Sequence, residues 1–253
     1  MCVIIQGNKK DITDQILETC FVSNKDGFGL MYIDQNNNLI VEKLYTKKLS
    51  KIKKVFKKHL PNIISNVALH FRFTTVGTTN NFNSHPFKVL EKSKGDLYDL
   101  SLMHNSPAIS RLEIDKTKSD TFHFVEYYLK PILKANPYLI DNKTFIDDLA
   151  KIINAHCDTR VLLLENKNNL FHLLGHWQEA QSLNVSNSTL NPPVYAGKYT
   201  SRAWDWDDDY NIQNNAIDWY QQTKKKQDQY FDDLKPYGYS PKNKKKKKLK
   251  YKI

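Results

Sequence analysis

The chain has 253 residues, enough for one large domain or two small ones, and 40% of them are hydrophobic, so a sizeable core can form. Its net charge of +11 is uneven, because residues 224–253 hold 12 Lys against 3 Asp and the other 223 residues carry only +2. The three cysteines form no CxxC pair, and the chain shows neither a signal-peptide pattern nor an apolar stretch of about 20 residues. We therefore expect a soluble cytoplasmic protein with no disulfide framework, no structural zinc and no membrane contact.

The first half of the chain alternates between expected strands and expected helices. Short apolar or β-branched runs predict strands over residues 2–6, 28–33, 39–45, 66–73 and 100–103. Apolar residues at helical spacing predict helices over residues 11–19 and 50–60. The second of these helices has its apolar residues on one face and lysines over the rest, which is typical of a basic amphipathic helix.

The second half begins with helical spacing over residues 121–133 and 145–153, and Pro131 is expected to disturb the first of these helices. Strands are predicted over residues 160–164 and 170–174, on either side of a turn. Strands, helices and then strands predict an α+β fold with mainly antiparallel sheets packed against helices. We expect this domain to span residues 1–192, followed by a Trp/Asp-rich segment at 193–223 and a disordered Lys-rich tail at 224–253.

Cys2 has two interpretations when it is taken alone. If Met1 is cleaved, Cys2 carries a thiol and a free α-amine, whose reference pKa of about 7.7–8.0 suits a general base at neutral pH. Nucleophile and base would then belong to one residue. The other interpretation is a small buried hydrophobic residue at the start of a strand.

Five short motifs follow this cysteine. They are NKDGFG at 24–29, HFRFTTVG at 70–77, NSHP at 83–86, MHNS at 103–106 and SDT at 119–121. In this order behind an N-terminal Met-Cys, they resemble the class II glutamine amidotransferases, members of the N-terminal nucleophile hydrolase superfamily, over about residues 2–186. The resemblance implies a four-layer αββα sandwich with antiparallel sheets. Residues 173–177 and 185–187 resemble a strand-turn-strand of short, stand-alone members.

The resemblance also implies the contacts to the substrate. Cys2 matches the nucleophile. Arg72 matches the arginine that binds the α-carboxylate of glutamine, for which a guanidinium offers a planar bidentate fork. Thr75 lies where the family contacts the same carboxylate. Asp120 matches the acid that binds the α-amino group, and its other interpretation is the N-cap of the helix that follows.

The oxyanion contacts are implied in the same way. Asn105 matches an asparagine whose side-chain amide stabilises the oxyanion, and the backbone N–H of Ser106 is the second donor. Two positions depart from the family, which commonly has His in place of Val76 and Gly in place of Ser106. A serine at this position would be strained if the backbone required a positive φ. The structural residues implied near the site are Asp26, Gly27, His70 and His85.

These roles imply that the glutamine side-chain amide is hydrolysed through a Cys2 γ-glutamyl thioester, without a metal or cofactor. About 60 residues follow residue 190, too few for a domain that uses the ammonia, so we expect a separate synthetase chain to receive it, or its release. Two alternatives stay open. One is an amidase that acts on γ-glutamyl compounds. The other is an inactive binding protein whose tail, with lysines at 244–248, contacts nucleic acid or an acidic partner.

Overall fold

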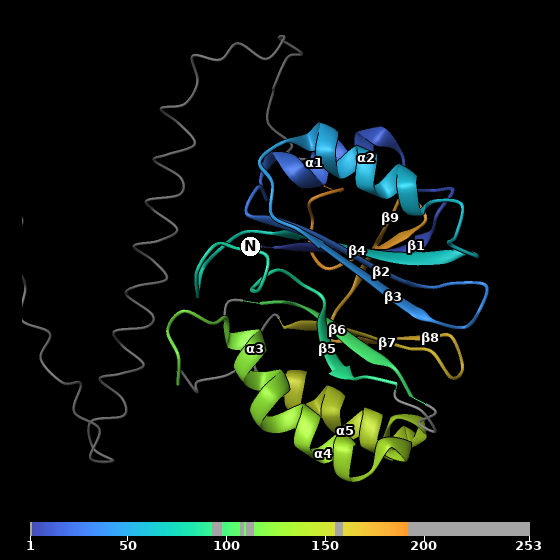
Figure 1. Ribbon diagram of the computed structural model, residues 1–253, viewed down its shortest axis with the longest axis vertical. Coiled ribbons are helices and arrows are strands. Elements are labelled where there is room, and N and C mark those ends of the chain that lie inside the picture. Colours follow the sequence, from blue (N-terminus) through green and yellow to red (C-terminus); the bar gives the residue numbers. More distant parts are fainter. Residues whose placement is uncertain (1, 93–97, 107–108, 110–113, 155–158, 192–253) are drawn as a thin grey trace, which may run out of the picture. The chain divides into compact units, whose positions relative to one another are not determined.

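The computed structural model describes residues 2–92, 98–106, 109, 114–154 and 159–191 (Figure 1). The chain divides into two compact units, Met1–Val194 and Tyr195–Ile253, and every described residue belongs to the first. The predicted Trp/Asp-rich segment and Lys-rich tail lie outside the described residues. No helix in the described part of the chain has both the length and the apolar character needed to cross a membrane.

The first sheet contains the N-terminal strand and is antiparallel throughout, in the order β3-β2-β4-β1-β10-β9. Its strands are β1 (Val3–Asn8), β2 (Gly27–Ile33), β3 (Leu39–Leu44), β4 (Asn66–Arg72), β9 (Gln178–Ala180) and β10 (Leu183–Val185). β1 therefore lies inside the sheet, with β4 on one side and β10 on the other. β9 and β10 have three residues each, and local patterns did not predict them; the strand-turn-strand expected over residues 173–177 and 185–187 reaches only Val185 of β10.

The second sheet is also antiparallel, in the order β5-β6-β7-β8. Its strands are β5 (Phe87–Leu90), β6 (Leu100–Asn105), β7 (Arg160–Glu165) and β8 (Leu170–Leu174). The sequence predicted all of these except β5. The described part of the chain is thus a mixed α+β structure with two antiparallel sheets, as the order of predicted elements indicated.

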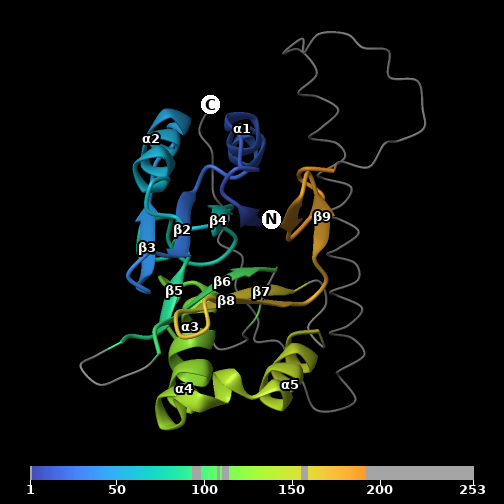
Figure 2. The same ribbon diagram turned by 90° about the vertical axis from the view of Figure 1, so that its right-hand side faces the viewer.

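Helices cover the outer face of each sheet, as Figures 1 and 2 show. α1 (Asp14–Val22) and α2 (Leu49–His59) pack on the first sheet. On the second sheet lie α3 (Asp120–Phe124), a π-helical turn η1 (Val125–Leu129), α4 (Lys130–Ala135), a 3-10 turn η2 (Pro137–Asp141) and α5 (Lys143–Asn154). The expected disturbance at Pro131 takes the form of this π-helical turn just before it, since proline has no N–H to donate to the preceding turn.

Three apolar clusters hold these layers together. One packs α1 and α2 against the first sheet, and a second packs the other helices against the second sheet. The third lies between the two sheets and includes Ile4, Met31, Ala68, Met103 and Leu162, all fully buried. Because side chains alternate along a strand, Cys2 and Asn105 project from the same faces as Ile4 and Met103, toward the space between the sheets.

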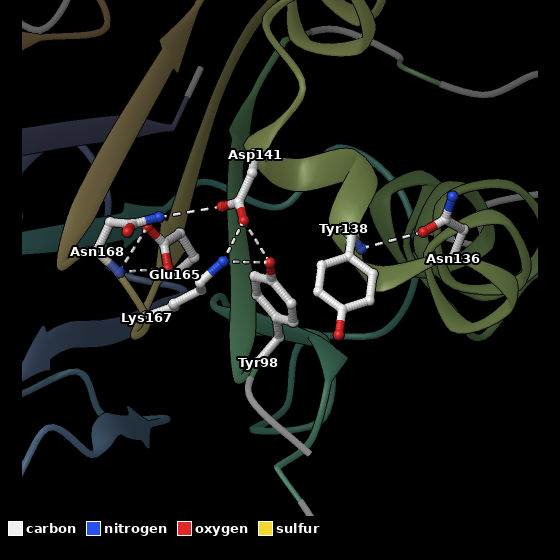
Figure 3. Close-up of polar contacts among 7 residues, drawn as sticks. All are labelled: Tyr98, Asn136, Tyr138, Asp141, Glu165, Lys167 and Asn168. Atoms are coloured by element: carbon white, nitrogen blue, oxygen red, sulfur yellow. Dashed lines mark hydrogen bonds and ion pairs between the residues drawn. The ribbon is translucent and has the colours of Figure 1, made fainter.

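A cluster of polar side chains lies at the end of the second sheet where β6 begins and β7 ends (Figure 3). Tyr98 and Lys167 both donate to Asp141 Oδ2, and Lys167 also donates to the Tyr98 hydroxyl at 2.9 Å. Asn168 donates to Asp141 Oδ1 at 3.0 Å. We call these four residues the Asp141 cluster. It ties the η2 turn to the β7–β8 hairpin.

Candidate functional site

Cys2 precedes β1 by one residue and is half-buried. Its sulfur accepts a hydrogen bond from Phe73 N at 3.3 Å and lies 3.4 Å from Phe73 O, to which a thiol can donate. Burial raises the pKa of the thiol, while the Phe73 N–H and the charge of Arg72 act to lower it. The Phe73 N–H is thus placed to stabilise a thiolate once one forms.

Arg72 ends β4, next to this cysteine, and is only 3% exposed, so it is not a surface residue. Its guanidinium donates to Val76 O at 3.0 Å and to Thr78 O at 3.1 Å. Two of its five N–H groups are used in this way, and the other three donate to no described residue, which leaves them for a ligand. Arg72, Cys2 and Asp120 are close enough for their charges to shift the pKa of the thiol and of the guanidinium.

The loop after β4 is held in place by Asn83, which is fully buried. The Asn83 side-chain amide donates to Thr78 O at 2.9 Å and to Thr117 O at 2.7 Å. Its oxygen accepts from Ser119 N at 3.0 Å. One side chain therefore connects the loop that orients Arg72 to the residues just before Asp120, which fixes the separation of these two charged groups.

Asp120 is the first residue of α3, but it does not cap the helix. Ser119 is the N-cap, since its hydroxyl accepts from Phe122 N at 3.2 Å. The interpretation of Asp120 as the cap is therefore wrong. Its carboxylate instead accepts from Ile109 N at 2.9 Å, outside the helix. This leaves a negative charge at the positive end of α3, where the helix dipole favours it.

Asn105 ends β6 and is 1% exposed. Its side-chain nitrogen donates to Ser186 Oγ at 2.8 Å. Ser186 Oγ also accepts from Ile4 N at 2.8 Å, so this hydroxyl joins β6 to the strand that follows Cys2. The Asn105 side-chain oxygen is buried and has no hydrogen-bond partner among the described residues.

The other predicted residues have supporting positions. The Asp26 carboxylate accepts from Thr74 N at 2.8 Å, directly beside Phe73. A Cβ at Gly27 would lie 2.4 Å from Ser84 Oγ, so any side chain there would force Ser84 to move. Thr75 is exposed on the loop after β4 and makes no side-chain hydrogen bond to a described residue. The Ser106 hydroxyl accepts from Thr159 Oγ1 at 2.9 Å. The φ angle of Ser106 is not positive, so its backbone does not have the strain that a serine in place of glycine could have caused.

His70 and His85 belong to a buried cluster behind this site, together with His104 and Thr121. The rings of His70 and His85 have their centroids 4.1 Å apart. The Thr121 hydroxyl lies 3.2 Å from His85 Nε2 and 2.8 Å from His104 Nδ1. Burial lowers the pKa of all three histidines, that of His70 to about 3, so they are neutral at pH 7. Within the described ranges, no group of three potential ligand side chains is arranged to hold a metal ion.

Sequence reasoning missed two residues that position the others. Ser186 fixes Asn105, and the Asn187 side-chain amide donates to Cys2 O at 2.8 Å. Both follow β10, and the stretch 185–187 was noted only for its likeness to a late strand-turn-strand.

The structure thus brings Cys2, Arg72, Asn105 and Asp120 to one region from four separate segments. No model of a protein family matches the chain, and no curated protein matches it either.

Proposed function

We propose that the protein is a class II glutamine amidotransferase of the N-terminal nucleophile hydrolase type, acting as a glutaminase on the side-chain amide. The observation that carries this proposal is the convergence of the Cys2 thiol with an arginine, a carboxylate and a buried asparagine amide. The two antiparallel sheets between helical layers support the αββα sandwich that such an enzyme requires.

In the proposed first step, removal of Met1 leaves the α-amine of Cys2 to take the thiol proton. The thiolate, held by Phe73 N–H, attacks the side-chain carbonyl carbon of glutamine and forms a C–S bond. The α-ammonium returns the proton to the nitrogen, the C–N bond breaks and ammonia leaves. Water then cleaves the γ-glutamyl thioester, which gives glutamate and restores the thiol.

The amino-acid end of glutamine suits the two charged groups. Its α-carboxylate would pair with the N–H groups of Arg72 that the loop carbonyls leave unused, and its α-ammonium with Asp120. The departure from the family at Val76 removes one possible side-chain contact to the carboxylate but leaves the orientation of Arg72 intact. Position 76 orients Arg72 through its backbone carbonyl, which any residue supplies equally. The recognition of a free amino acid favours glutamine over a protein amide.

The oxyanion would be held by Asn105 and the backbone N–H of Ser106. The Asn105 side-chain nitrogen has two hydrogens, and Ser186 Oγ accepts one of them. The second is left for the oxyanion, with its direction set by the first. A donor that is already oriented costs no reorganisation when charge develops, which is why such groups accelerate acyl transfer.

A glutamine-mimicking diazoketone followed by peptide mass spectrometry tests the proposal. We expect a single label on Cys2, in a peptide that lacks Met1, and loss of glutamine hydrolysis in Cys2→Ala. Cys20→Ala is the matched control, because Cys20 is fully buried in the α1 layer and burial raises its pKa to about 12. Retention of Met1, or unchanged hydrolysis by Cys2→Ala, would refute the enzyme.

The same preparation separates the remaining alternatives. Faster turnover of γ-glutamyl compounds than of glutamine would identify a γ-glutamyl amidase, and no turnover of either would favour a binding protein. We propose further that a separate synthetase chain consumes the ammonia. Native purification should then recover a stable second chain, and a protein isolated without one counts against this part alone.

A further inference from the structure

α2 carries a concentration of positive charge that the proposed function does not use. Residues 47–58 contain seven lysines and no acidic residue. The apolar side of the helix is committed to the core, since Ile52 and Phe56 are 1% and 4% exposed. Six of the seven lysines are exposed. Lys57 lies near Asp14, and we call the other five the α2 lysine face: Lys47, Lys48, Lys51, Lys54 and Lys58.

Within the described part of the chain, these five lysines form no ion pairs. Among the residues that the structure describes, none of the five has a carboxylate within 4.0 Å, and the nearby Asp14 pairs instead with Lys53 at 3.3 Å and Lys57 at 4.0 Å. α5, on the opposite side of the two sheets, differs, because its two lysines pair with acids of the same helix. Lys143 lies 2.6 Å from Asp147, and Lys151 lies 2.8 Å from Asp148.

The arrangement is unfavourable for the isolated helix. Lysines three and four residues apart on a helix repel one another. Lys47 and Lys48 stand at the N-terminal end, where the helix dipole disfavours positive charge, and Lys48 occupies the N-cap without a capping side chain. An anionic partner would reduce both the repulsion between the lysines and their unfavourable interaction with the helix dipole. In α5, acidic residues of the same helix offset the charge of the lysines instead.

We propose that the α2 lysine face binds the phosphate backbone of nucleic acid without reading its sequence. Lys51, Lys54 and Lys58 follow one another along about 10 Å of helix axis, so their ammonium groups can meet successive phosphates of a strand. Lysine is a point charge on a flexible stem, which suits phosphate, and the face has no arginine or aromatic side chain for bases. A bilayer fits less well because the apolar side of α2 is already buried and cannot insert.

The test uses the full chain, a labelled DNA duplex of random sequence and a titration of salt. Three variants each lose five lysines to glutamine. One changes the α2 lysine face. The second changes lysines 244–248 of the tail. The third is a matched control that changes exposed lysines elsewhere, namely Lys25, Lys116, Lys134, Lys143 and Lys151. Thermal melting verifies that each variant is folded, and glutamine hydrolysis is measured separately.

We expect the α2 variant to bind duplex about tenfold to a hundredfold more weakly than the control variant. The slope of log affinity against log salt should decrease by up to about 0.9 for each phosphate contact removed. Equal binding by the α2 and control variants would overturn the proposal, as would loss of all binding in the tail variant alone. Binding to phosphatidylcholine–phosphatidylserine vesicles but not to the duplex would assign the face to membranes instead. None of these outcomes depends on whether glutamine is hydrolysed.

Discussion

The two ends of the second sheet place polar groups in opposite ways. At one end, the Asp141 carboxylate receives Tyr98, Lys167 and Asn168, so charge and hydrogen-bond donors are matched within the protein (Figure 3). At the other end, Asn105 keeps a buried side-chain oxygen without a described partner. The nearby Arg72 guanidinium donates two of its five N–H groups to backbone carbonyls.

The difference separates a structural cluster from a candidate binding site. A network whose members satisfy one another has nothing to gain from a ligand, and its contribution is to local stability. Polar groups that are held in place but incompletely paired lose solvation when the protein folds and recover it when a ligand binds. Changes at the two ends should therefore affect different measurements.

The largest expected effect is a loss of stability in acid. Its cause is the buried histidine cluster, which lies at the same end of the second sheet as Asn105. The pKa values of His70, His85 and His104 are lowered by burial, so below pH 6.5 the unfolded chain takes up protons that the folded chain cannot. Stability is therefore retained above pH 6.5 and lost as the pH falls, by up to about 1.4 kcal/mol per pH unit for each histidine. Urea unfolding at pH 7 and at pH 5 measures this loss.

The Asp141 cluster should respond in a lower window. The pKa of Asp141 is lowered from 3.8, with the hydrogen bond from Lys167 foremost among the lowering causes although burial opposes it. The contribution of the Asp141 carboxylate to the free energy of unfolding is present above pH 3.8 and is lost only as the pH falls through the lowered pKa.

A free energy of unfolding that stays constant from pH 7 to pH 5 would contradict the assignment of three neutral buried histidines.

The next largest effect is expected for Asn105→Ala. Removal of an oxyanion donor typically lowers kcat by about 10²–10³, or roughly 3–4 kcal/mol, with little change in KM. Steady-state glutamine hydrolysis measures both constants. Asn168→Ala removes the corresponding amide from the Asp141 cluster and should leave kcat unchanged. Equal kcat values for the two variants would mean that Asn105 has no role in the reaction.

A smaller effect is expected for Ser186→Ala. The Asn105 amide would keep its place on β6 but lose the acceptor that sets its direction, so kcat should fall on the order of tenfold, with KM nearly constant. Ser186→Thr retains the hydroxyl and should recover part of the loss. If Ser186→Ala instead raises KM and leaves kcat intact, the residue acts on substrate binding and not through Asn105.

The smallest effect is expected for Asp141→Asn, which removes the ion pair between Asp141 and Lys167. The variant should melt about 2–4 °C lower, since a half-exposed ion pair contributes little in water. Its kcat and KM for glutamine should match those of the unaltered protein. A variant that melts normally but loses activity would show that the two ends of the sheet are coupled.

Local patterns in the sequence were sufficient for most strands and for the helical layers, because apolar periodicity directly reflects which faces are buried. β5 escaped prediction because it has four residues directly after Pro86, and one of them, Lys88, is partly exposed. Ser119 and Asp120 are adjacent and both favour the N-cap, so only the structure could show that Ser119 is the cap and that Asp120 accepts from Ile109 N instead.

The candidate site shows the same limit more clearly. The motifs around Arg72 and Asn105 could be recognised because each is contiguous in the chain. The contact between Ile4 and Ser186 joins residues 182 positions apart, and no local pattern encodes it. Likewise, Asn83 was noted as part of a motif, but its partners Thr117 and Ser119 are more than 30 residues away in the chain and became visible only in the fold.

The place of β1 between β4 and β10 sets an order of events during synthesis. β1 and β4 emerge from the ribosome early and can pair at once, whereas β10 and the side chains of Ser186 and Asn187 arrive after more than a hundred further residues. Until then the thiol-bearing terminus has one free edge and Asn105 has no hydroxyl to orient it. If the protein is the glutaminase proposed above, its oxyanion donor becomes fully oriented only when translation of this unit is nearly finished.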